Sequence, residues 1–373
     1  MTLTNPSAYS MSHDDAALPG KHRLNFHALA AQHGDCIVLS YGDEGHDYRI
    51  VVDAGVEGTA ERLKKVLNED PNAIWELLVV SHIDADHIGG VLTLLADKSV
   101  AGRFQDIWFN GRHHLDPPGT ESLGVAQGIE LQEALCADGI SWNRAFGKNA
   151  VCLDADVPVK KTLDSGAKIT LLSPTLPRLT AVRHLWDRYL RTVEEAKKEQ
   201  PSKAEPAPPG LERMGGEAMN ISNLAATKTQ LDGSATNASS IAFLFEFGGK
   251  RLLLGADANP KDLVAASLHV AEEVRKDLHV FKLPHHGSAK NVTESLLRAY
   301  SALNYVVSTN GDHHGHPDDV AIARVVESRP DARLLFNYAG KASGRWQEQA
   351  ALPGKKFTVL AGEGEEGVRL RLL

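Results

Sequence analysis

Ser81-His82-Ile83-Asp84-Ala85-Asp86-His87 places two histidines and two aspartates within six positions, directly after the apolar run Ile74–Val80. The run predicts a buried strand, and charged groups beside a core are costly unless they have partners. Imidazole and carboxylate are the groups that hold Zn²⁺ or Mn²⁺. The stretch therefore predicts a metal site at the end of a strand. The alternative is a charged loop that caps the next helix, with Asp86 as its N-cap.

Further polar pieces follow other predicted strands, and the ends of strands are where an α/β sheet places its ligand site. Each piece has an ordinary alternative: a turn, a helix N-cap before Pro260, or a solvated surface loop. The pieces are Asp53 in 51–55, Asp257 in 253–257, the pair His285 and His286 in 282–288, and His316 in 310–317.

The motif His-x-Asp-x-Asp-His, followed by Ile88-Gly89-Gly90, resembles the metallo-β-lactamase superfamily, whose usual form is His-x-His-x-Asp-His. Asp84 stands in place of the second histidine. That variant looks like the metallo-β-lactamase domain of ComEC-type DNA-uptake proteins and their soluble relatives. The resemblance runs from about Leu24 to the C-terminus, and it implies an α/β fold of four layers, an αββα sandwich.

The resemblance also implies two divalent metal ions, Zn²⁺ or Mn²⁺. His82 and Asp84 would face one metal, Asp86 and His87 would face the second, and Asp257 would bridge the two. Many hydrolases of the superfamily carry a further histidine ligand before the bridging aspartate. Here that approach reads Thr236-Asn237-Ala238-Ser239-Ser240, so the donor set is poorer in histidine, which tilts the expected metal toward Mn²⁺ or mixed occupancy.

Residues around the metals receive supporting and catalytic roles from the same resemblance. Asp53 would support the metal loop by hydrogen bonding without being a ligand. One histidine of the pair should be a ligand, for which we favour His286, and His285 should contact phosphate or transfer a proton. His316 would contact the substrate or leaving group, so the expected catalytic residues are Asp86, His285 and His316.

Three more residues are candidates for binding the substrate. His33 lies in Gln32-His33-Gly34-Asp35, where the family has a Gly-Gln-Gly-Asp loop over the site, and it replaces a glycine there. Ser288 follows the histidine pair, and Asn310 begins the stretch that contains His316.

Composition narrows the class of protein. Hydrophobic residues make up 42% and charged residues 24%, which is ordinary for a soluble globular chain. No apolar run approaches the roughly 20 residues that span a bilayer, residues 1–21 lack the features of a secretory signal, and the three cysteines form no CxxC pair. We therefore expect a cytoplasmic protein without a membrane partner.

The net charge of −8 argues mildly against a protein that coats long nucleic acids, but not against a nuclease.

The pattern along the chain predicts one domain. Residues 1–22 are expected to form a flexible arm, and residues 23–373 a single metallo-β-lactamase-like domain. A polar, proline-rich stretch at about 200–236 is expected to be a flexible insertion, because metal motifs flank it on both sides. A lid or regulatory segment is the alternative to a disordered surface loop.

These expectations lead to a binuclear metal-dependent phosphodiesterase, most plainly a nuclease that cleaves DNA or RNA with a hydroxide formed at the metals. The choice of phosphate as substrate rests on the ComEC-like variant, by analogy. A hydrolase of small phosphodiesters or other esters is the first alternative. A metal-stabilised binding protein without turnover is the second.

Overall fold

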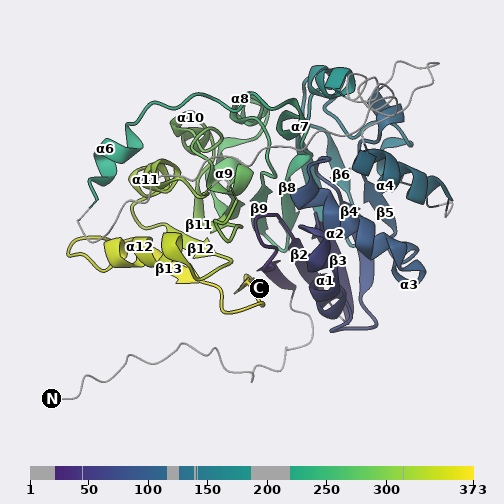
Figure 1. Ribbon diagram of the computed structural model, residues 1–373, viewed down its shortest axis with the longest axis horizontal. Coiled ribbons are helices and arrows are strands. Elements are labelled where there is room, and N and C mark those ends of the chain that lie inside the picture. Colours follow the sequence, from purple (N-terminus) through teal and green to yellow (C-terminus); the bar gives the residue numbers. More distant parts are fainter. Residues whose placement is uncertain are drawn as a thin grey trace, which may run out of the picture.

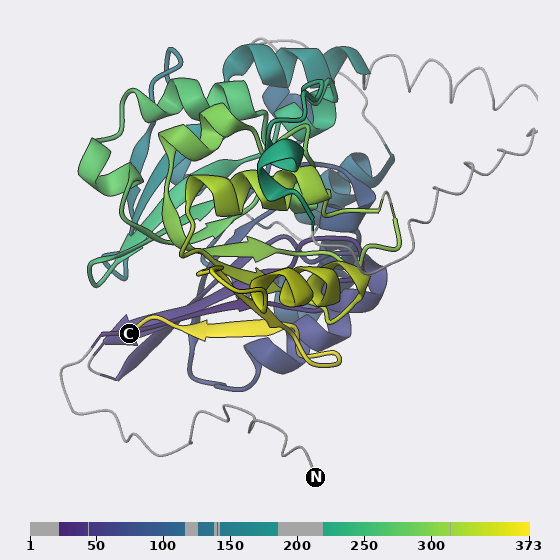
Figure 2. The same ribbon diagram turned by 90° about the vertical axis from the view of Figure 1, so that its left-hand side faces the viewer.

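Two β-sheets lie face to face at the centre of the computed structural model, and helices cover their outer faces (Figures 1 and 2). The structure describes residues 22–43, 45–115, 126–137, 140, 142–185, 219–313 and 315–373. Most of the predicted N-terminal arm and residues 200–218 of the predicted insertion lie outside this part of the chain. The expected α/β sandwich is confirmed.

The first sheet takes its described strands from residues 23–108 and the second from residues 160–361, except that the last strand, at 368–371, returns to the first sheet. In order across the first sheet, the described strands are β14 (Val368–Arg371), β1 (Arg23–Ala28), β2 (Ile37–Asp43), β3 (His46–Val52), β4 (Ile74–Val79) and β5 (Asp106–Trp108). Across the second sheet they are β13 (Thr358–Ala361), β12 (Arg333–Phe336), β11 (Ala302–Val307), β10 (Leu278–Lys282), β9 (Lys250–Leu254), β8 (Ala242–Phe247), β7 (Lys168–Ser173) and β6 (Lys160–Thr162).

Alternation along the strands builds three apolar layers. On β2, Ile37 and Leu39 pack between the sheets against residues such as Phe243 of the second sheet. Val38, which points the other way, packs under the helices of the first sheet. On the far side, Phe281 of β10 packs under the helices of the second sheet. Three separate apolar layers require four layers of secondary structure, which is the sandwich.

The described helices divide between the two outer faces. The first sheet carries α1 (Ala60–Leu67), α2 (Ala85–Ala96), α3 (Lys98–Ala101) and α4 (Ala126–Ala137). The chain also contains α6 (Ile221–Ala225), α7 (Ala235–Ala238), α8 (Pro260–Ser267), α9 (Glu272–Arg275), α10 (Glu294–Ala299), α11 (Asp319–Ser328) and α12 (Lys341–Ala350). Within the described ranges, no helix is both long and apolar enough to cross a membrane.

One predicted helix is wrong in its extent. The sequence pattern predicts a single helix over about 260–274, but the structure has two, α8 and α9. The backbone is extended at Ala271, which precedes the acidic pair Glu272 and Glu273. Acidic residues favour the N-terminus of a helix, so this pair begins a new helix instead of continuing the old one.

Parallel strand ends bring the polar loops together. Strands β3 and β4 run parallel, as do β9, β10 and β11, and the loops that carry the candidate residues follow these strands. The sheets are joined at this edge by Ile241, whose N–H donates to the carbonyl oxygen of Ser81 at 2.9 Å. The Ser308 hydroxyl likewise donates to the carbonyl oxygen of Gly34 at 3.0 Å. The ends of both sheets therefore form one site.

Helix α2 is seated so closely on the loop after β3 that it requires a glycine. A Cβ at position 90 would lie 2.1 Å from the carbonyl oxygen of Ala54. The Gly90 N–H donates to the carbonyl oxygen of Gly55 at 2.9 Å, which fixes the helix there. The same helix begins with the metal motif, so this contact sets the position of the site.

We predict that Gly90→Ala destabilises the protein by about 1–3 kcal/mol, because the added methyl group must push α2 away from the loop. Gly102→Ala is the matched control, since a Cβ at that position meets nothing within 4 Å. Urea unfolding of both variants measures the difference. Equal stability of the two variants would contradict the inference that α2 requires a glycine where it contacts the loop after β3.

Candidate metal centre

The carboxylates of the central motif are not helix caps. Asp84 occupies the N-cap position of α2, yet its side chain accepts no capping hydrogen bond. Asp86 lies in the first turn, and its Oδ2 is 3.2 Å from Nε2 of His286. The alternative in which Asp86 is the N-cap is therefore wrong, and both carboxylates are available to another partner.

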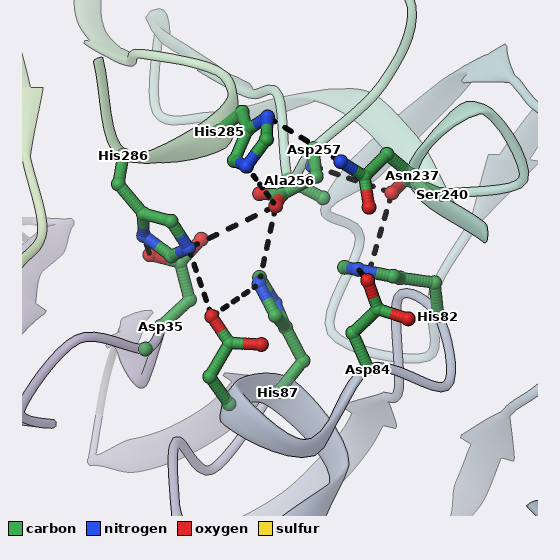
Figure 3. A network of polar contacts seen from close by, with 12 residues as sticks. Asp35, His82, Asp84, His87, Asn237, Ser240, Ala256, Asp257, His285 and His286 are labelled. Carbon is green, nitrogen blue, oxygen red and sulfur yellow. Dashed lines mark hydrogen bonds and ion pairs between the residues drawn. The ribbon is translucent and has the colours of Figure 1, made fainter. Parts of the chain in front are cut away.

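Asp257 lies at the centre of the cluster (Figure 3). Its Oδ2 is 3.5 Å from Nε2 of His87, and it is 3.8 Å from Nε2 of both His285 and His286. The capping alternative is wrong here too, because the cap of α8 is Asn259. The Asp257 side chain is 4% exposed, so this carboxylate is turned into the protein and toward the imidazoles.

An unusual backbone turn aims both adjacent histidines inward. His285 and His286 have φ angles of 48° and 53°, and Gly287 follows with 86°. Residues with a side chain avoid this left-handed region, at a cost on the order of 1–3 kcal/mol each. Consecutive residues on a strand would point in opposite directions, but this turn directs Nε2 of both rings at Asp257.

Each imidazole is held by its other ring nitrogen. Nδ1 of His87 is 2.8 Å from Oδ2 of Asp53, and Nδ1 of His285 is 3.1 Å from Oδ2 of Asp232. Nδ1 of His286 donates to the carbonyl oxygen of Ser308 at 2.8 Å. These acceptors favour protonated Nδ1, which leaves the Nε2 lone pairs facing the cluster.

His82 is held in the same way by hydroxyl groups. Its Nδ1 is 3.0 Å from Oγ of Ser81 and 3.3 Å from Oγ of Ser240. Its Nε2 is 3.6 Å from Oδ2 of Asp84, whose side chain is 38% exposed. Thr236 donates its hydroxyl to the same Asp84 oxygen at 3.2 Å, so the Thr236–Ser240 stretch supplies supporting groups to this half of the site.

The polar atoms that face the centre fit a divalent cation. Within the described residues, Nε2 of His82, His87 and His286 and Oδ1 of Asp257 are buried without a hydrogen-bond partner. Unpaired buried polar atoms are rare in proteins, and imidazole nitrogen with carboxylate oxygen is a usual donor set for Zn²⁺ or Mn²⁺.

Two overlapping groups of these donors converge within 4.8 Å. One is His82, His87 and Asp257, and the other is Asp86, His87 and His286. The structure thus gathers the predicted ligands and places Asp84 beside the first group.

The electrostatics of the cluster also favour cations. Burial lowers the pKa of the His286 imidazole, but Asp257, Asp35 and Asp86 outweigh it and raise the pKa to about 9. Burial likewise lowers the pKa of His87, and Asp257, Asp86 and Asp53 again outweigh it and hold it well above its usual value. The carboxylates therefore create a negative field that a divalent metal ion would offset.

Two groups near the site were missed by the sequence analysis. Asp35 and Lys282 form a fully buried ion pair beneath His286, and Oδ1 of Asp35 is 3.3 Å from Nδ1 of that histidine. Burial raises the pKa of Asp35, but Lys282 and His286 outweigh it and bring the pKa to about 2. The signal was present, because a lysine ends the apolar strand β10 and an aspartate follows Gly34.

Asp53 makes hydrogen bonds to the loop after β4 and to His87, while its support of a metal stays a prediction. Its Oδ1 accepts the Ser81 N–H at 2.7 Å, and its Oδ2 accepts the Ser81 hydroxyl at 2.6 Å as well as His87 Nδ1. Asp53 is fully buried and has a φ of 57°. It is therefore more than a turn aspartate, because it joins the ends of β3 and β4 to the imidazole of His87.

The predicted substrate-binding residues lie in three different settings. His33 stacks on His313, with ring centroids 4.9 Å apart. Asn310 donates its backbone N–H to the carbonyl oxygen of Gln32, so the loops of the two sheets meet there. Ser288 is 1% exposed and lies within the histidine turn, where it is poorly placed to meet a substrate.

His316 is adjacent to the cluster. Its ring centroid is 5.2 Å from that of His285, and its Nδ1 is 3.7 Å from Oδ2 of Asp318. The structure therefore brings the predicted catalytic histidine next to His285, which is 31 positions earlier in the chain.

Comparison with known proteins agrees with the motif. Residues 31–103 match the model of the metallo-β-lactamase superfamily, so the expected resemblance to that superfamily is confirmed over the segment that contains the central motif. Most members of this superfamily are metal-dependent hydrolases. The narrower ComEC-like resemblance stays a prediction.

Among solved structures, one similar chain is the metallo-β-lactamase fold protein YhfI from Bacillus subtilis. It is 11% identical, with a TM-score of 0.41, and the alignment covers 94% of this chain and 100% of that one. No curated protein matches the chain significantly.

We predict that the purified protein binds two divalent metal ions per chain, and that Asp257→Asn loses at least one of them, because Asp257 faces both donor groups. Elemental analysis after gel filtration measures this. Asp331→Asn, which alters an exposed ion pair with Arg329, is the control and should retain both ions. Full metal content in Asp257→Asn would count against a bridging role.

We also predict that Asp53→Asn weakens metal binding by about 10- to 100-fold, because His87 loses the carboxylate that fixes its Nε2 toward the metal. Competition with a chromophoric chelator measures the affinity. Circular dichroism should show an intact fold. An unchanged affinity would reduce Asp53 to a structural link between β3 and β4.

Proposed function

We propose that this protein is a binuclear metal-dependent phosphodiesterase, most specifically a nuclease that acts on DNA or RNA. The observation that carries the proposal is the convergence of three unpaired imidazole nitrogens on the Asp257 carboxylate, beside Asp86. That donor set supports the metal-dependent hydrolase. The narrower substrate class rests on the groups around it and on the ComEC-like form of the motif.

Two divalent ions held by such donors would lower the pKa of water toward 7 and offset charge on phosphate oxygens. The chain itself contributes the geometry. Asp257 and Asp86 present Oδ2 to the centre, while Asp53 and Asp35 hold the histidines behind them. A site whose groups are fixed before the substrate arrives needs little rearrangement during the reaction.

His285 and His316 are suited to the leaving oxygen. Burial lowers the pKa of His285, but its hydrogen bond with Asp232 and the charge of Asp257 outweigh it and raise the pKa. A raised pKa makes this imidazole a better proton carrier beside the site, which suits a group that exchanges a proton with the reacting oxygens. The His316 ring packs against the His285 ring, with centroids 5.2 Å apart, so both imidazoles lie on the same side of the site.

The stacked pair of His33 and His313 supports an anionic substrate. The rings of this pair stack with centroids 4.9 Å apart, and although burial lowers the pKa of His33, a neutral imidazole still carries one N–H donor. N–H donors complement phosphate oxygens, while carboxylates would repel them. The acidic net charge of −8 favours the second candidate, a hydrolase of small phosphodiesters.

The test is cleavage of single- and double-stranded DNA, RNA, a cyclic nucleotide and bis(p-nitrophenyl) phosphate, each with Mn²⁺, Zn²⁺ or Mg²⁺. We expect cleavage of at least one nucleic acid, and a loss on the order of 10³-fold in Asp86→Ala. Asp331→Asn should retain full activity.

Each other outcome points to a different function. Turnover of only the small esters would replace the nuclease with the second candidate. Two bound metals without any turnover, together with biological effects that survive Asp86→Ala, would identify a metal-stabilised binding protein instead.

A further inference from the structure

We propose that Asp232 is a positioning residue of this site: it holds the His285 ring so that Nε2 is directed at Asp257. Asp232 belongs to the polar stretch in which the sequence offered no core-forming pattern. The kinetic part of this inference rests on the proposed function, but the orientation of the ring does not.

The contact between Asp232 and His285 defines the tautomer of the ring. Nδ1 of His285 lies 3.1 Å from Oδ2 of Asp232 and 3.0 Å from Oδ1 of Asn291. The amide nitrogen of Asn237 is farther from Nδ1, at 3.3 Å, and it donates to Oδ2 of Asp232 at 2.8 Å, so the two nearer oxygens favour a proton on Nδ1. Nε2 is then the lone-pair nitrogen, and it is the atom that lies 3.8 Å from Oδ2 of Asp257.

Asp232 is itself fixed by hydrogen bonds to both oxygens. Its Oδ1 accepts the backbone N–H of Ser234 at 2.9 Å. Its Oδ2 accepts from the side-chain amides of Asn237 at 2.8 Å and Asn291 at 3.1 Å. The side chain is 10% exposed. A carboxylate that accepts at every side is a rigid anchor for the ring.

A second anchor keeps the stretch in place. Arg324 is buried, and it donates to the carbonyl oxygen of Thr227 at 2.6 Å and to the Thr229 hydroxyl at 3.1 Å. That hydroxyl donates in turn to the carbonyl oxygen of Ala289 at 2.8 Å, just beyond the histidine turn. Residues 227–237 therefore form a strap between α11 and the site, and Asp232 is the point at which the strap meets a site imidazole.

The same construction recurs at the two neighbouring imidazoles. Asp53 lies behind His87, and Asp35 lies behind His286, in each case at Nδ1. In all three pairs the carboxylate comes from an element other than the one that carries the histidine. Asp232 completes the set, which distinguishes it from a surface aspartate that meets a histidine by chance.

Asp232→Asn is the most direct test. Both oxygens of the Asp232 side chain accept hydrogen bonds from N–H groups. In the asparagine variant, either orientation of the amide therefore places its NH₂ group against another N–H. The His285 ring should then lose its fixed tautomer. Asp232→Glu keeps the charge and both acceptor oxygens, and should restore part of the effect.

The first readout is independent of activity. In zinc-loaded protein with ¹⁵N-labelled histidine, the His285 signals are assigned by their absence in His285→Gln. We expect a protonated Nδ1 in the natural sequence and a loss of that signature in Asp232→Asn. Asp262→Asn is the matched control, because that aspartate is also largely buried and bonded, to Arg178, but lies away from the cluster. Its His285 signals should not move.

The second readout is kinetic. On any phosphodiester that the protein cleaves, Asp232→Asn should lower kcat by about 10- to 100-fold with KM changed by less than about twofold. Unchanged His285 signals in Asp232→Asn would overturn the proposal, and so would an unchanged kcat.

If Asp232→Asn does not fold, Asp232→Ser takes its place, and failure of both to fold would make the residue purely structural. Absence of all turnover in the natural sequence would refute the proposed function, while the nuclear magnetic resonance result would still decide the role of Asp232.

Discussion

The structure depends on a concentration of unpaired donor atoms at the edge where its two sheets meet. Asp257 faces the Nε2 atoms of three histidines, and Asp86 lies beside one of them. Nε2 of His82, His87 and His286 and Oδ1 of Asp257 are buried without hydrogen-bond partners, which opposes folding, and a divalent cation bound there would offset that cost. Each sheet delivers donors to one place, so an ion bound there would add a further link between the sheets.

The surroundings of the donors are as specific as the donors. Asp53, Asp35 and Asp232 each stand behind an imidazole, and each comes from a different segment of the chain. This arrangement fixes the tautomer and direction of each ring before any ligand arrives. Left-handed conformations at His285 and His286 add a local cost, which the surrounding hydrogen bonds offset. Rigidity of this kind suits hydrolysis, because a fixed site stabilises charge as it develops.

The sequence by itself determined the fold class and most of the donors. A buried strand that ends in His82–His87 gave the metal motif, and alternating apolar residues gave the strands of a sandwich. Asp257 could be found in the same way, because it follows an apolar strand through a glycine. These signals are local: a strand end, a turn and a cluster of ligand-type residues lie within a few positions of one another, so periodicity and residue type suffice to detect them.

Only the tertiary structure decided which distant groups support those donors. Asp232 lies in a polar stretch that reads as a loop, and Asp35 and Lys282 are far apart in the chain, so no local pattern could pair either with a histidine. The direction of the His285 ring was likewise open, because adjacent residues on a strand point apart and only the observed turn aims both inward. Long-range pairing follows from how the sheets and helices pack, and that packing is a property of the whole chain.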